Sequence, residues 1–201
     1  MNSIKEIKLD ELQTGDLILF HGKSSIFSKF IEYFTKTPYS HIGMIVIDPE
    51  FTDPPLKGIY LWESCNEDFG DSEDKKFKVG VEISDFKKIL DERVNNYDLY
   101  IRKYKGPKIT TEQLQKIHNV VKDKPYDINI IDWIMAYYRK DIKPQKTNRF
   151  WCSALTGYIY TTLGFLPSST DWSILYPSDF SNKYGTLQYI GIELENDKII
   201  I

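Results

Sequence analysis

Short apolar runs separated by polar and proline-containing segments fill the first half of the chain. Residues 16–20 form one such run and predict a buried strand. The β-branched run at 40–47 predicts a central strand, and residues 59–64 predict a further strand that pairs antiparallel with it. The other elements predicted in this half are strands at 79–83 and 99–104, with a helix near 84–91 between them. This half therefore predicts most of an antiparallel sheet of about five strands.

In the second half the apolar positions take helical spacing. They predict helices at 111–121, 130–138 and 153–163, and prolines punctuate the pattern. Residues 187–201 return to strand-like alternation. A sheet that packs on a helical half is an α+β architecture, and 201 residues suit one domain spanning 1–201.

One further helix is predicted at residues 24–35, where Ile26, Phe30 and Phe34 share an apolar face opposite Glu32. Packing into the core is the plainer interpretation of this face, and peripheral membrane contact is the alternative. The chain has no apolar run of about 18 residues and no secretory signal at its start. We therefore expect a cytoplasmic protein without a transmembrane helix.

Composition narrows the class of function. Hydrophobic residues make up 41% and charged residues 27%, which is ordinary globular composition. The formal net charge of −3 supplies no basic field, so we expect no nucleic-acid partner. Two cysteines and three histidines show no metal-site spacing, so no metal and no cofactor is expected. The sequence leaves the oligomeric state open.

Cys152 is the first candidate for chemistry, because it lies where an aromatic stretch gives way to a predicted helix. The positive end of a helix dipole favours a thiolate, and free backbone N–H groups at a helix start can hold an oxyanion. A buried structural cysteine is the competing interpretation. Position alone does not separate the two.

His41 is the second candidate, since it opens a strand whose other residues are almost all apolar. Gly43 shares its face at period two and leaves room for another element to approach closely. A lone histidine here is also compatible with a purely structural role. Its interpretation therefore depends on what lies beside it.

Glu63 is the third candidate, because period two places it on the same face as Leu61 in a mostly apolar strand. A carboxylate that points inward needs a partner. If the strands that begin at His41 and end near Glu63 are adjacent, that partner is the imidazole, which the carboxylate would orient. A solvent-exposed charge at the strand end is the competing interpretation.

Five short motifs occur in one order along the chain: Leu12-Gln13-Thr14-Gly15-Asp16-Leu17-Ile18-Leu19, Ser40-His41-Ile42-Gly43-Met44, Lys124-Pro125-Tyr126-Asp127, Phe150-Trp151-Cys152-Ser153 and Tyr176-Pro177-Ser178-Asp179. In these motifs the chain resembles the circularly permuted papain-like amidases, the YiiX/YaeF-like group of the NlpC-type cysteine peptidase superfamily. Lecithin-retinol-acyltransferase-like proteins are more distant relatives of that group. The histidine precedes the cysteine, which is the permuted order.

The resemblance implies a permuted papain-like fold, with Cys152 as nucleophile, His41 as base and Glu63 as the polar third member. Tyr126 matches a family tyrosine that lines the site near the oxyanion. The family usually has an acidic residue two places after the nucleophile, where this chain has Ala154. Because that residue lies outside the triad, we expect altered substrate or packing contacts rather than loss of chemistry.

The expected function is a cysteine hydrolase that cleaves an amide (peptide, isopeptide or N-acyl) or ester bond through an acyl-thioester. A lipid acyltransferase or phospholipase using the same residues is one alternative, with a lipid substrate in place of a peptide or N-acyl compound. A protease of protein modifiers and a binding module without turnover are the others. Among the remaining candidates, His21 is expected to be a bystander and His118 to be solvated. Cys65 is also expected to be a bystander, with a place on the rim of the site as the alternative, because it lies close to Glu63 in the sequence.

Overall fold

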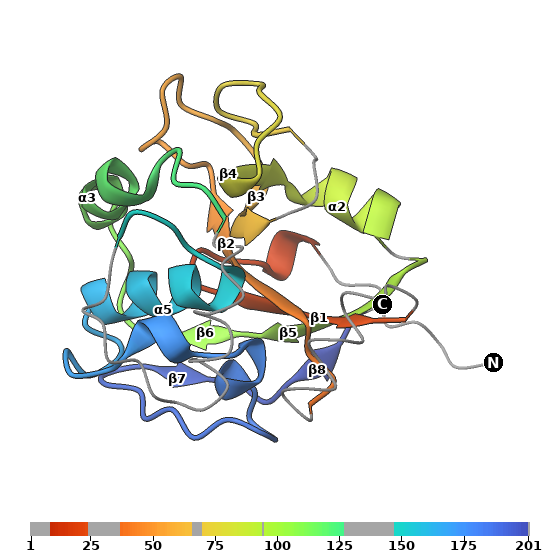
Figure 1. Cartoon of the computed structure of the whole chain (residues 1–201), viewed down its shortest axis with the longest axis vertical. Helices are drawn as coiled ribbons and strands as arrows, with labels where there is room; N and C mark the ends of the chain where they lie inside the picture. The colour runs from red at the N-terminus through yellow and green to blue at the C-terminus, as the bar shows by residue number, and fades with distance from the viewer. Residues whose placement is uncertain (1–8, 24–36, 66–69, 94, 127–146, 201) are drawn as a thin grey trace.

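The structure is a computed structural model that describes residues 9–23, 37–65, 70–93, 95–126 and 147–200, and its fold is α+β (Figure 1). Its main sheet has six antiparallel strands in the order β4-β3-β2-β1-β5-β8. Their bounds are β1 (Leu17–Gly22), β2 (His41–Ile47), β3 (Ile59–Cys65), β4 (Gly80–Asp85), β5 (Tyr97–Arg102) and β8 (Lys198–Ile199). The five strands predicted from the first half are all present, and β8 from the chain's end adds a sixth at the edge.

Three α-helices lie within the described residues: α2 (Phe86–Arg93), α3 (Thr111–Val121) and α5 (Cys152–Thr162). The short elements are the 3-10 helices η1 (Leu9–Glu11), η2 (Trp172–Ile174) and η3 (Pro177–Phe180) and the ribbon of β6 (Tyr104–Lys105) with β7 (Glu193–Leu194). The helices predicted at 24–35 and 130–138 fall outside the described residues. No helix among those described is long and apolar enough to cross a membrane.

Alternation along the strands divides the core between the two faces of the sheet. Trp62 points to the face that α3 and α5 cover, whereas Leu61 points to the face that α2 covers (Figure 1). Gly43 permits the close packing on the α2 side, because a Cβ there would lie 2.7 Å from the Leu61 side chain. The close approach that the sequence predicts at Gly43 is therefore made by Leu61 of the neighbouring strand.

The Thr14-Gly15-Asp16 motif serves the fold by fixing α5 against the start of β1. The Tyr160 hydroxyl, in α5, donates a 2.6 Å hydrogen bond to the Gly15 carbonyl. Gly15 has a φ of +102°, and a Cβ there would lie 2.9 Å from the Tyr104 ring. The buried Asp16 carboxylate accepts the Tyr104 N–H at 2.8 Å and an ion pair from Lys103. The bond from Tyr160 fixes the position of the helix that carries Cys152 relative to the sheet.

The expectation that His118 is solvated is wrong, because its side chain is buried. Glu73 is buried and accepts hydrogen bonds from His118 at 2.9 Å and from Lys122 at 2.6 Å. The Asp53 N–H is a third donor to Glu73, at 3.0 Å. Three donors offset the desolvation of one carboxylate, which explains why a charged segment is buried against α3.

Candidate active site

Cys152 is the first residue of α5, as the sequence predicts, and its side chain is buried. Trp151 caps the helix without a side-chain hydrogen bond, so the N–H groups of the first turn point out of the helix end. The loop that follows α5 fixes this end, because the Leu175 carbonyl accepts a 2.6 Å bond from Ser153 and a 3.3 Å bond from Trp151. Cys152 therefore has the setting in which a helix start favours a thiolate.

The segment that leads into Cys152 is aligned on the end of β3. The Ser64 hydroxyl donates a 2.7 Å hydrogen bond to the Phe150 carbonyl. Phe150 also pairs with Tyr126 in an isolated parallel bridge, and its N–H donates to the Pro125 carbonyl at 3.1 Å. The buried Tyr126 and the nucleophile candidate consequently belong to neighbouring stretches of backbone at one end of the sheet.

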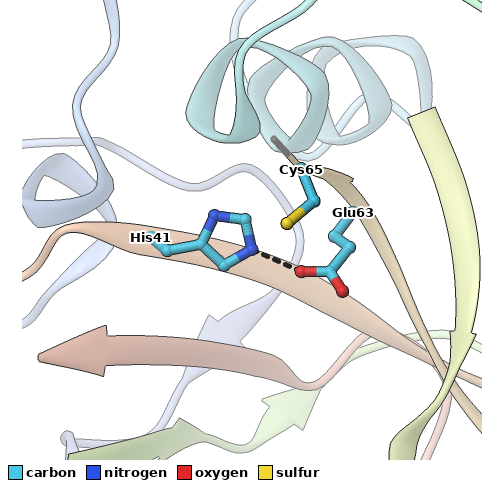
Figure 2. Close-up of side chains that lie close together, drawn as sticks. All are labelled: His41, Glu63 and Cys65. Carbon is cyan, nitrogen blue, oxygen red and sulfur yellow. Dashed lines mark hydrogen bonds and ion pairs between the residues drawn. The ribbon is translucent and has the colours of Figure 1, made fainter. Parts of the chain in front are cut away.

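His41 opens β2 and meets Glu63 of the adjacent strand. The imidazole Nε2 and the Glu63 Oε2 are hydrogen-bonded, and the Glu63 side chain has no solvent exposure (Figure 2). The ring also packs edge-on against Phe20, with centroids 5.0 Å apart. The inward carboxylate predicted from period two is therefore present, and its partner is the imidazole.

The charge of the imidazole depends on Cys152 as well as on Glu63. Burial disfavours the imidazolium, but the negative sulfur of Cys152, a hydrogen bond to it and the Glu63 carboxylate outweigh burial and raise the pKa of His41 to about 9. The imidazole thus interacts with both a thiol and a carboxylate, a combination in which a thiolate and an imidazolium stabilise each other.

Cys65 lies closer to this group than the sequence suggests. Its buried thiol points toward His41 and Glu63, and one ligand atom from each of the three residues lies within 4.8 Å of the others (Figure 2). Period two along β3 contains the signal, since Cys65 follows Glu63 by two residues and shares its face. Neither cysteine forms a disulfide bond.

A second buried carboxylate adjoins Glu63. Glu82 of β4 lies directly opposite it in the strand register, and both residues are buried. The Ser84 hydroxyl donates a 3.0 Å hydrogen bond to Glu82. Sequence analysis missed this pair because a cross-strand neighbour depends on register, which a single sequence does not provide.

His21 and one surface hollow lie away from this group. His21 is 3.6 Å from the Asp98 carboxylate in an ion-pair arrangement on a half-buried surface. A hollow of about 580 Å³ opens near Ile47, at the opposite end of β2 from His41. Its lining includes Gln13, Phe51 and Lys108 but none of the candidate catalytic residues.

Comparisons with known proteins add little to this description. No family model matches the chain, and a search of curated proteins finds no match. Among solved structures the chain is similar to metalloprotein yiiX from Escherichia coli O157:H7, at 17% identity, over 92% of this chain and 97% of that one. The TM-score is 0.43, so no conclusion about the fold or chemistry of this chain is drawn from this similarity. That protein bears the name of the group that the five motifs resemble.

Proposed function

We propose that the chain is a cysteine hydrolase of permuted papain-like design, which cleaves an amide or ester bond through an acyl-thioester on Cys152. One observation carries the proposal: His41 bonds the buried Glu63 through Nε2 and interacts with Cys152, the first residue of helix α5. A cysteine, an imidazole and an orienting carboxylate in that order form the group that nucleophilic thiol catalysis requires.

In the proposed reaction the Cys152 thiolate attacks the carbonyl carbon, and the negative charge passes to the carbonyl oxygen. The N–H groups at the start of α5 stabilise this oxyanion, with Tyr126 beside them. The tetrahedral intermediate collapses, and the His41 imidazolium gives its proton to the leaving amine or alcohol. The neutral imidazole then takes a proton from water, which attacks the thioester and releases the acid.

Glu63 has a supporting role in this scheme. It accepts the Nε2–H of His41, which keeps the ring turned toward Cys152 and stabilises its charged form. Ala154, where the resembled family has an acidic residue, is buried in the core beside the nucleophile. The proposed chemistry does not use that position.

The proposal is tested by trapping the acyl-enzyme. The protein is treated with EDTA, incubated with N-acyl amide, peptide and ester substrate mixtures, denatured in acid and analysed by peptide mass spectrometry. We expect a thioester adduct on Cys152, none in Cys152→Ala, and much less in His41→Gln. An adduct that forms equally on Cys65, or that survives in Cys152→Ala, contradicts the assignment of the nucleophile.

A further inference from the structure

Two of the residues proposed for catalysis, His41 and Glu63, form a set of metal donors together with Cys65. His41 offers nitrogen, Glu63 offers oxygen and Cys65 offers sulfur, and one such atom from each lies within 4.8 Å of the others. Imidazole, carboxylate and thiolate are the three ligand types that Zn²⁺ takes in proteins. The site therefore contains a mixed set suited to a borderline-soft ion rather than to Mg²⁺ or Ca²⁺.

The distances suit a tetrahedral ion after small side-chain movements. Zinc bonds of about 2.0–2.3 Å place the donor atoms of a tetrahedral site about 3.3–3.8 Å apart. His41 and Cys65 begin and end their strands, so their side chains lie at the margin of the sheet's regular pairing. The imidazole keeps 14% of its side-chain surface exposed, which gives an ion a route to the site.

The charge around this group also favours a cation. Glu63 and Glu82 are directly opposed and buried, and like-charged neighbours in a sheet are unfavourable unless a positive group offsets them. In the metal-free protein the hydrogen-bonded His41 imidazole offsets this charge when it is protonated, and a divalent ion bound to Glu63 would take its place. A second acidic group, formed by Asp71, Asp74 and Asp123, offers carboxylates alone, and the Lys78 ammonium already contacts all three at 2.5–3.1 Å.

We propose that His41, Glu63 and Cys65 form a binding site for one Zn²⁺ ion and that the bound ion holds the hydrolase inactive. On binding, Cys65 releases its thiol proton and the His41 imidazolium releases the proton on its coordinating ring nitrogen, both to solvent. Bonds form from zinc to the Cys65 sulfur, to that ring nitrogen and to a Glu63 carboxylate oxygen, and a water molecule completes the tetrahedron. The imidazole lone pair is then committed to the metal, so His41 cannot exchange a proton with Cys152 or the leaving group. The inhibitory consequence rests on the proposed function, whereas the existence of the site does not.

The site is tested without any measurement of activity, by titrating the EDTA-treated and dialysed chain with Co²⁺. A sulfur-to-cobalt charge-transfer band with visible bands of a tetrahedral ion should saturate at one ion per chain and disappear when Zn²⁺ is added. Cys65→Ala should abolish the sulfur band and weaken Zn²⁺ binding by at least about 100-fold, the upper end of the loss caused by removing an outer-shell partner. Circular dichroism verifies that each variant is folded.

Further variants keep the test decisive. Glu63→Gln should also weaken Zn²⁺ binding. His21→Gln is the control, because His21 lies beside Asp98 and is not one of the three proposed ligands, so this variant should bind Zn²⁺ as wild type does. Cys152→Ala should retain the sulfur-to-cobalt band, because Cys65 supplies the sulfur. A folded Cys65→Ala protein with the wild-type band and affinity overturns the site, as does a band lost only in Cys152→Ala.

The inhibitory role has its own readout. One equivalent of Zn²⁺ should stop formation of the Cys152 adduct, and EDTA should restore it. Adduct formation at an unchanged rate in the zinc-loaded protein overturns inhibition. If the metal-free protein forms no adduct while the Co²⁺ spectrum is intact, the proposed hydrolase function is wrong and the metal site stands.

Discussion

The Nε2 of His41 and the Oε2 of Glu63 are hydrogen-bonded across neighbouring strands, and the carboxylate side chain has no exposure to solvent. The carboxylate is therefore shielded from water, and its bond fixes the orientation of the ring. Together with Cys152, Glu63 also determines the charge of the imidazole.

Glu63→Gln should lower the rate of acyl-enzyme formation by about 10- to 1,000-fold. Removal of the corresponding charge in a serine triad costs about 10⁴-fold, and a thiolate–imidazolium pair depends on its carboxylate less. Glu63→Ala should be slower still, and should lose about 1–3 kcal/mol of stability because a buried ring N–H is left unsatisfied. The rate is measured by denaturing the reaction mixture at successive times and quantifying the Cys152 adduct, and the free energy of unfolding is measured by urea titration.

The matched control for this change is Glu82→Gln. Glu82 is also a buried glutamate, and it lies opposite Glu63 in the same sheet. Since the bond from Glu63 to His41 persists in that variant, it should cost less activity than Glu63→Gln. If Glu82→Gln slows acylation more than Glu63→Gln does, another group orients the imidazole.

The pH dependence of acylation should follow His41. Its pKa is raised from 6.5 to about 9 because the Cys152 and Glu63 interactions outweigh burial, so the imidazolium is present at neutral pH and is lost as pH rises through about 9. Leaving-group protonation is lost with it, and the rate should fall above about pH 9. The stability gained from the charged ring is fully present below pH 6.5 and is lost over the same upper range. A metal-free protein whose rate is flat from pH 8 to pH 10 contradicts this expectation.

The two thiols should differ in reactivity. Cys152 opens helix α5 and interacts with the His41 imidazole, a setting that activates a thiol, whereas Cys65 lies two residues from the Glu63 carboxylate on the same strand face. Limiting iodoacetamide at about pH 6 should therefore alkylate Cys152 first. Peptide mapping measures the two sites in one sample, and His41→Gln should remove the preference. Equal labelling in the wild-type protein would falsify the thiolate assignment.

Elements governed by local signals could be predicted from the sequence. Residues 111–121 form α3 with the predicted bounds, because Thr110 and Gln113 make a reciprocal capping box that fixes its start. The pairing of β2 with β3 is likewise confirmed, since two β-branched and aromatic runs joined by a loop favour antiparallel neighbours. The meeting of His41 with Glu63 follows from that pairing.

Features that depend on distant contacts could not be predicted. The burial of His118 requires Glu73, which lies 45 residues earlier and is brought to α3 by tertiary packing. The opposition of Glu63 and Glu82 depends on strand register, and one residue of slip would place Glu82 on the other face. Burial of these acidic side chains follows from where their partners lie, which local pattern does not encode.

Glu73→Gln should destabilise the protein by about 1–3 kcal/mol at neutral pH, because buried donors lose a charged acceptor. Despite burial, which raises it, bonds from Lys122, the Asp53 N–H and His118 hold the pKa of Glu73 below its usual value. This stabilisation is present above pH 4.5 and is lost as pH falls through the lowered pKa. Urea unfolding should therefore give a difference between wild type and variant that shrinks in acid. A difference that does not change with pH would argue for a packing defect instead.

Ser64→Ala should separate the position of Cys152 from its chemistry. The Ser64 hydroxyl is fully buried and holds the Phe150 carbonyl, two residues before the nucleophile, on the end of β3. Without that bond the start of α5 is less firmly placed relative to His41, and a shift of about 1 Å in a reacting group can cost about 100-fold in rate. Acylation should therefore slow by up to about 100-fold, while urea unfolding changes by only about 1 kcal/mol. Ser181→Ala is the control, because it removes a buried hydroxyl that bonds Asp197 near the end of the chain. If both variants lose stability equally and neither slows acylation in the folded protein, the bond from Ser64 supports the fold without positioning the nucleophile.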